Sequence, residues 1–262
     1  MTDPSYPPPQ SAAQPEPAPY GSAPAAGGPV GAGPAPGTDL GADLSAALTF
    51  AWSAFTRNLG AFLGASAVWF VVFFIVIGGG TVGFVAYMAT VAPTTSEPSG
   101  GQVLIAWAII TGASLVTGLL AMVWQAGVYR GGVSVVNGGR ATFGQVLIGS
   151  GNVLLTVLLT GVIAGIGSML CYLPGLVASL FLLFAVPAAA MGVSPFRAIG
   201  QSFALVKENF LTSFIGWLIL GVATTIAAIG ITLIVLVPLI ALFQLGLYQR
   251  LTGQQLPDPQ VA

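Results

Sequence analysis

Long apolar stretches separated by short polar ones dominate the sequence from residue 58 onward. No charged residue occurs in 58–96, 141–196 or 209–249. A helix rises about 1.5 Å per residue, so roughly 20 residues cross the hydrocarbon core of a bilayer. The pattern predicts an all-α membrane protein with six transmembrane helices in three hairpins. The expected spans are about 60–90, 102–128, 151–168, 173–192, 210–227 and 231–248.

The segment before the first span has helical periodicity but contains too many polar residues to cross a membrane. Thr38 or Asp39 can cap it, and apolar residues then recur at 3-4 spacing as far as Phe55. Asp43 lies near the helix start, where the dipole favours an acid. We expect an amphipathic helix at the membrane interface, with Trp52 at headgroup level.

Similar short sequences begin the three hairpins. An asparagine lies where each interfacial segment turns into a span, at Asn58, Asn152 and Asn209. Before Asn209, Ser194 can cap a helix and Pro195 suits its first turn. We expect three copies of an amphipathic helix followed by two spans, with the middle copy the most degraded.

Residues 1–37 differ in composition from the rest of the chain, because Pro, Ala, Gly and Ser dominate them. So few bulky residues cannot bury enough area to offset the entropy of ordering. We expect a disordered, proline-rich cytoplasmic tail before a membrane domain over 38–252 and a short C-terminal tail over 253–262. A solvated tail without a partner and a docking segment for a protein both remain open.

All the basic residues can be placed on one side of the membrane. Arg57 precedes the first span, Arg250 follows the last, and the others lie in the connections after spans two and four. By the positive-inside rule this face is cytoplasmic, with both termini inside the plasma (inner) membrane. The expected topology and interface anchors are Trp52, Arg57, Arg130, Arg140, Arg197, Lys207 and Arg250.

Composition narrows the function classes. Charged residues make up 5% of the chain and mean hydropathy is +0.93, so the expected partners are membrane lipids. With a net charge of −1, neither a nucleic-acid footprint nor a polybasic lipid patch is visible in the sequence. Histidine is absent and Cys171 is the only cysteine. We therefore expect no cofactor, no metal site and no enzyme.

Polar residues inside the spans are few, and none away from the span ends is ionisable. This argues against an ion-coupled transporter, which usually needs charges at membrane depth. Gln125 and Gln244 are the candidates for interhelical polar contacts, since an amide in hydrocarbon needs a partner. Cys171, between spans three and four, is expected near the outer face.

Two runs carry a family resemblance: CYLPGL at 171–176 and SPFRAIGQSFALVKEN at 194–209. With the apolar span between them, they resemble actinobacterial six-span integral membrane proteins that have Pro/Gly-rich N-terminal tails. These are distantly similar to the membrane domain fused to some glycerophosphodiester phosphodiesterases. The resemblance covers roughly 40–252 and implies topology and compartment. In the fused enzymes catalysis belongs to a separate soluble domain with acidic and histidine ligands, which nothing in this chain matches.

Two functions follow as expectations. The first is a non-enzymatic structural, scaffolding or accessory component of the cell envelope, with a protein partner bound through the tail or the membrane domain. The alternative is a transporter or channel for a lipid or other apolar solute, which would use a cavity between the hairpins.

Overall fold

The computed structural model describes residues 34–91, 99–170, 172–227 and 230–257. In these residues every regular element is helical, and six helical stretches are long and apolar enough to cross a membrane. The expected all-α fold class with six candidate spans is therefore confirmed. Most of the expected tail, residues 1–33, and Cys171 lie outside the described residues.

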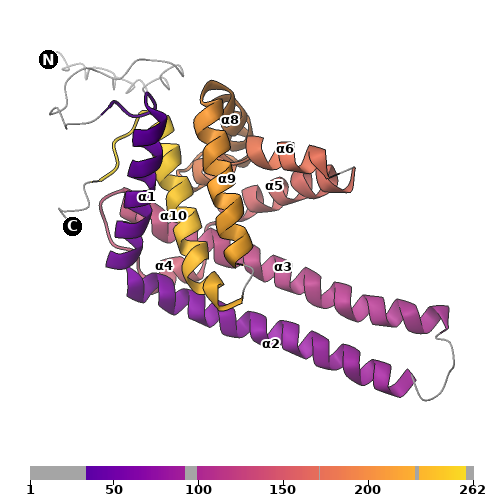
Figure 1. Cartoon of the computed structure of the whole chain (residues 1–262). Coiled ribbons are helices and arrows are strands. Elements are labelled where there is room, and N and C mark those ends of the chain that lie inside the picture. The colour runs from indigo at the N-terminus through magenta and orange to yellow at the C-terminus, as the bar shows by residue number, and fades with distance from the viewer. Residues whose placement is uncertain (1–33, 92–98, 171, 228–229, 258–262) are drawn as a thin grey trace, which may run out of the picture. The chain divides into compact units, whose positions relative to one another are not determined.

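The helices follow one another in three units, each beginning with a helix that precedes a hairpin (Figure 1). The first unit holds α1 (Leu40–Arg57), α2 (Leu59–Val91) and α3 (Gly100–Val136). The second holds α4 (Phe143–Leu147), α5 (Gly151–Met169), α6 (Leu173–Phe181) and α7 (Ala185–Ala190). The third holds α8 (Pro195–Glu208), α9 (Phe210–Ala227), the 3-10 turn η1 (Gly230–Thr232) and α10 (Leu233–Leu251).

The first hairpin is much longer than the other two. Its helices α2 and α3 have 33 and 37 residues, whereas α5, α9 and α10 have 18 or 19. At 1.5 Å per residue the hairpin is about 50 Å long, against about 30 Å of hydrocarbon. The helix α3 runs past the expected end of its span, through Arg130, and ends at Val136, with Asn137 as its C-cap, because Gly138 turns the chain at φ 78°. The base of the first hairpin is the end where α2 starts and α3 ends.

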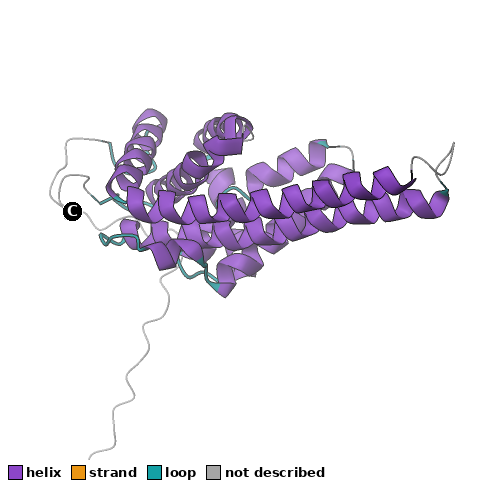
Figure 2. Cartoon of the chain, turned by 90° about the horizontal axis from the view of Figure 1, so that it is seen from below, coloured by secondary structure: helices purple, strands orange, loops and turns teal. Residues whose placement is uncertain are grey.

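The two ends of this hairpin have different surroundings. Near the base, side chains such as Phe62 and Tyr129 are fully buried against other helices. The far half, comprising residues 74–91 and 100–120, extends away from the other helices as a pair (Figures 1 and 2). There Phe74 is 72% exposed and Leu104 is 71% exposed. Apart from the buried Val91, the far half is therefore an apolar surface that no other described helix covers.

The fourth span, expected as one helix over 173–192, is broken into α6 and α7. Pro187 has no N–H, so the Leu183 carbonyl loses its helical donor, and the proline ring crowds that carbonyl. The chain turns through 182–184, where Leu182, Leu183 and Phe184 are all buried. The freed backbone groups are bonded by Ser202 of α8, whose hydroxyl donates to Phe181 O (2.7 Å) and accepts from Phe184 N (3.0 Å).

The units dock on one another in a closed ring. Each unit's first helix packs on the last span of the unit before it: α4 on α3, α8 on α7, and α1 on α10. It also contacts the preceding unit's first span, α4 with α2, α8 with α5 and α1 with α9. At the centre α3, α7 and α10 contact one another. Figure 1 shows α1, α9 and α10 side by side, crossing the α2–α3 hairpin steeply.

The helix α8 shows which residues of a unit's first helix face the protein and which face its surroundings. Ser194 occupies its N-cap position without a side-chain capping bond, and Pro195 occupies its first turn, as the sequence indicates. Ala198, Ser202 and Leu205 pack inward and are buried. The larger apolar residues divide between the two sides, since Val206 is fully buried whereas Phe196 is 75% exposed. Alanine, serine and aliphatic side chains thus make the protein contact, and Phe196 meets the surroundings.

Candidate functional site

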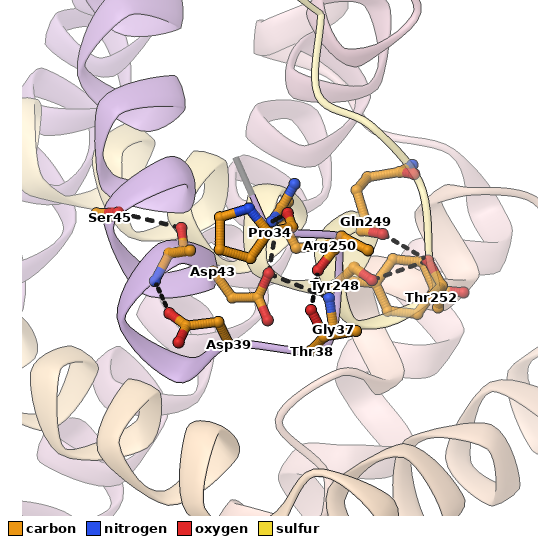
Figure 3. Close-up of polar contacts among 12 residues, drawn as sticks. Pro34, Gly37, Thr38, Asp39, Asp43, Ser45, Tyr248, Gln249, Arg250 and Thr252 are labelled. Carbon is orange, nitrogen blue, oxygen red and sulfur yellow. Dashed lines mark hydrogen bonds and ion pairs between the residues drawn. The ribbon is translucent and has the colours of Figure 1, made fainter. Parts of the chain in front are cut away.

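A buried carboxylate joins the two ends of the membrane domain. Asp43, on the first turn of α1, is 1% exposed. Its Oδ1 atom accepts from Arg250 Nε of α10 at 2.8 Å and from the Gly37 backbone N–H at 3.1 Å (Figure 3). Only this ion pair is recorded among the described residues. A buried carboxylate needs such partners, because desolvation otherwise penalises its charge.

The segment before α1 wraps around the end of α10. Thr38 N–H and its hydroxyl both donate to Ala35 O, at 3.2 and 2.6 Å, and close a turn. Gly37 lies in that turn at φ 78°, where a side chain would be strained. Arg250 also donates from a terminal guanidinium nitrogen to Pro34 O at 3.3 Å. Residues 34–37, expected as the end of the tail, therefore contact the last span.

The two acids at the start of α1 have separate roles. Asp39 is exposed and accepts from Ala42 N–H at 2.7 Å, which is an N-cap contact. Asp43, one turn later, points to α10 instead (Figure 3). The sequence predicts the cap at Asp39 and a favourable helix dipole at Asp43, but no local feature predicts the pairing of Asp43 with Arg250. We call the contacts among Pro34, Gly37, Asp43 and Arg250 the clasp.

Below the clasp, α1 packs along α10 through small residues. A Cβ atom on Gly246 would lie 3.0 Å from Phe50 Cδ1 and 3.3 Å from Ala47 Cα. Residue numbers rise along α1 as they fall along α10, so the two helices are antiparallel. The close approach requires glycine at 246, because any side chain would push the helices apart.

The joint between α3 and α4 repeats this arrangement. A Cβ atom on Gly127 would overlap the Val146 carbonyl of α4. One turn further on, Arg130 donates to Ile148 O at 3.3 Å, as Arg250 reaches Asp43 one turn beyond Gly246. The two spans share the pattern Trp/Phe-Gln-x-Gly-x-Tyr at 124–129 and 243–248. This internal match is the signal that could have revealed both docking glycines from the sequence.

The repeat also relates Gln125 and Gln244, the two expected interhelical contacts. Gln244 accepts a hydrogen bond from the Tyr129 hydroxyl, which joins α10 to α3. Gln125 is half-buried, and no hydrogen bond of its side chain to another described residue is recorded. A contact that the sequence did not suggest lies nearby, where Gln201 donates to the Tyr248 hydroxyl at 2.9 Å and joins α8 to α10.

The other expected anchors lie on exposed surface. Trp52 is 61% exposed on α1, on the side away from α10. The side chains of Arg57, Arg130 and Arg140 are exposed near the base of the first hairpin, and those of Arg197 and Lys207 are exposed on α8. Arg250 is the exception, since its side chain is only 12% exposed in the clasp.

The clasp and the docking joints hold helices together and contain no arrangement that would activate a nucleophile. Among the described residues no group of three His, Cys, Asp or Glu side chains comes together. The chemistry that the arrangement supports is attachment: the start of the membrane domain is fastened to its end.

Comparison with known proteins gives relatives without a stated activity. The chain is 28% identical over 226 residues to the uncharacterized protein Rv2560 of Mycobacterium tuberculosis, covering 81% of this chain and 69% of that protein. The uncharacterized protein Mb2590 of Mycobacterium bovis matches to the same extent. No family model matches the chain, and no solved structure matches it significantly. The protein is thus a multi-pass helical membrane protein, similar to uncharacterized mycobacterial proteins.

Proposed function

We propose that this protein is a non-enzymatic scaffold or accessory component of the plasma membrane, which uses the far half of its first hairpin to hold a partner. The far half carries the proposal. It presents exposed apolar residues such as Phe74, Val82 and Leu104 along helices that continue well beyond the length needed to cross hydrocarbon. Helices in a membrane associate by packing, and an unpartnered pair offers a long surface for it.

The closed ring of three units favours a structural role for the rest of the domain, as the platform from which the first hairpin extends. The three units are fixed to one another by the clasp, by the docking glycines and by the hydrogen bonds of Ser202 to the break between α6 and α7. A rigid platform of this kind suits a protein that positions another one. In our proposal the basic face is cytoplasmic, both termini lie inside, and the tail is available to cytoplasmic proteins.

The family resemblance fits the same proposal. In the glycerophosphodiester phosphodiesterases that carry a similar membrane domain, the activity belongs to a separate soluble domain. An accessory membrane protein would act likewise beside a partner that performs the chemistry. The partner in our proposal is a protein, and neither a cofactor nor a nucleic acid takes part.

Photo-crosslinking in intact cells tests the proposal. A photoreactive amino acid at Leu104 or Val82 should give one protein adduct of defined mass, in near-stoichiometric yield. The same amino acid at Leu158, a 41% exposed position on the second hairpin, serves as the control and should give little of that adduct. Adducts to lipid alone at both far-half positions would refute the scaffold.

One observation favours the alternative of a transporter or channel for a lipid or other apolar solute. Near the end of the far half, α2 and α3 border an open hollow of about 390 Å³ lined by side chains that include Phe84, Met88 and Trp107. Its size falls within the range of small-molecule sites. Retention of a single lipid species by the purified protein, lost in a Met88→Trp variant that fills the hollow, would favour this function.

A further inference from the structure

Three arginines that are far apart in the sequence lie at neighbouring backbone positions at the base of the first hairpin. Ala141 N–H donates to Asn58 Oδ1 at 2.9 Å, and Ala141 Cβ lies 3.6 Å from the position of a Cβ on Gly131. Each of these three residues is next in sequence to an arginine. We call the resulting cluster the basic corner: Arg57, Arg130 and Arg140.

The basic corner carries positive charge that no recorded ion pair neutralises in the described residues. All three side chains are exposed, and the one recorded side-chain bond among them is the 3.3 Å bond from Arg130 to the Ile148 carbonyl. Asp43 is 14 residues before Arg57 on α1, about 21 Å away along the helix, and is already paired with Arg250. The remaining described acids are Asp39, near that same helix start, and Glu208 on α8.

Exposed apolar side chains flank the basic corner. Leu59, two residues after Arg57, is 41% exposed, and Ile148, which accepts from Arg130, is 56% exposed. Phe143 is 46% exposed, with its ring 3.4 Å from the position of a Cβ on Gly64 of α2. A soluble anion would gain nothing from these groups. A lipid has both parts, an anionic head for arginine and acyl chains for leucine and phenylalanine.

We propose that the basic corner binds the phosphate headgroup of an anionic phospholipid, whose acyl chains lie along Leu59 and Phe143. Guanidinium groups suit this ligand, because their planar donors pair with phosphate oxygens in bidentate fashion. Three arginines on one corner fix a headgroup more firmly than a single positive-inside residue would. The site lies at the opposite end of the first hairpin from the far half, so this inference stands independently of the scaffold function.

Native mass spectrometry of the full chain in a neutral detergent tests the site. Wild-type protein titrated with phosphatidylglycerol should retain it in preference to phosphatidylcholine. The double variant Arg57→Gln/Arg140→Gln should lower that preference about 25-fold, since each arginine near a membrane surface contributes about fivefold. The control Arg197→Gln/Lys207→Gln removes two exposed cations from α8 and should leave the preference unchanged.

A second double variant distinguishes the loss of arginine charge from a loss of the folded structure. Arg57→Lys/Arg140→Lys should keep most of the preference, and a single monodisperse species in each variant shows that the fold persists. An equal loss in both Gln double variants would reduce the effect to net charge and overturn the site. So would equal retention of both lipids by the wild type, or displacement of phosphatidylglycerol by millimolar inorganic phosphate.

Discussion

Arg250 and Asp43 are 207 residues apart in the sequence, and their side chains meet at 2.8 Å. The contact fastens the last turn of α10 to the start of α1, so the ring of three units closes at a charged contact. An ion pair of this kind lowers stability strongly when one partner is removed, because the other charge is left without compensation.

The clasp predicts an energetic coupling between its two charged residues. Asp43→Ala and Arg250→Ala should each lower the free energy of unfolding in mixed micelles by about 1–3 kcal/mol. The double variant should lose less than the sum, with a coupling of about 0.5–3 kcal/mol. Asp39→Ala removes an exposed cap on the same helix and should add to Arg250→Ala without coupling. Strict additivity of Asp43 and Arg250 would contradict the clasp.

The docking glycines predict a graded series of Gly→Ala variants. Gly127→Ala meets the Val146 backbone and should cost about 3 kcal/mol or prevent folding, since backbone cannot move aside easily. Gly246→Ala meets the Phe50 ring edge at 3.0 Å and should cost about 1–2 kcal/mol. Gly118→Ala, in the same helix as Gly127 but with nothing within 4 Å, should be neutral or slightly stabilising. Thermal unfolding followed by circular dichroism ranks the three.

The broken fourth span depends on one hydroxyl. Ser202→Ala leaves Phe181 O and Phe184 N without their partner in a buried place, and should cost about 1–3 kcal/mol. Ser114→Ala is the matched control, because that exposed hydroxyl bonds only to Ile110 O of its own helix. Comparable effects of the two substitutions on unfolding would count against the bridge.

Membrane insertion should tolerate a longer deletion of the N-terminal tail than stability does. Deleting residues 1–33 should leave both membrane abundance and stability unchanged. Deleting 1–37 should still permit insertion, but it removes the bonds of Gly37 to Asp43 and of Pro34 to Arg250 and should cost about 1–2 kcal/mol. Membrane fractionation and unfolding of both deletions check this; identical stabilities would show that 34–37 contribute nothing.

The ends of α3 should lie on opposite sides of the membrane, because 37 helical residues separate them by about 55 Å. In a Cys171→Ala background, Ser99→Cys should react with an impermeant maleimide in intact cells, and Asn137→Cys only after lysis. The reverse pattern would invert the proposed orientation. The natural Cys171, expected near the outer face, should be labelled in intact wild-type cells.

The fold class was predictable because it depends on apolar runs and their lengths, which the sequence displays directly. The bounds of α1 and α8 followed from Asp39, Ser194 and Pro195, whose capping chemistry is local. The break in the fourth span was not expected. Pro187 weakens a helix, but a break is stable only because Ser202 from a different helix bonds the backbone groups that it frees. The pairing of Asp43 with Arg250 likewise has no local signal.

The basic corner was missed for a similar reason. Counting charges along the chain gives a net charge near zero and spreads the arginines over 83 residues between Arg57 and Arg140. The bond from Ala141 to Asn58 and the contact of Ala141 with Gly131 bring their backbone positions to one place. Long-range packing, not composition, therefore decides where this protein concentrates charge.

The docking of α1 on α10 has a consequence for the order of assembly during synthesis. The helix α1 leaves the ribosome before the other described helices and its partner α10 leaves after them, so α1 must wait for the whole membrane domain to be translated. The neighbouring joints, α4 on α3 and α8 on α7, can form as soon as each helix emerges. Closure of the ring therefore requires that translation has passed α10, and a chain truncated before that helix would leave α1 undocked and open to quality-control proteases.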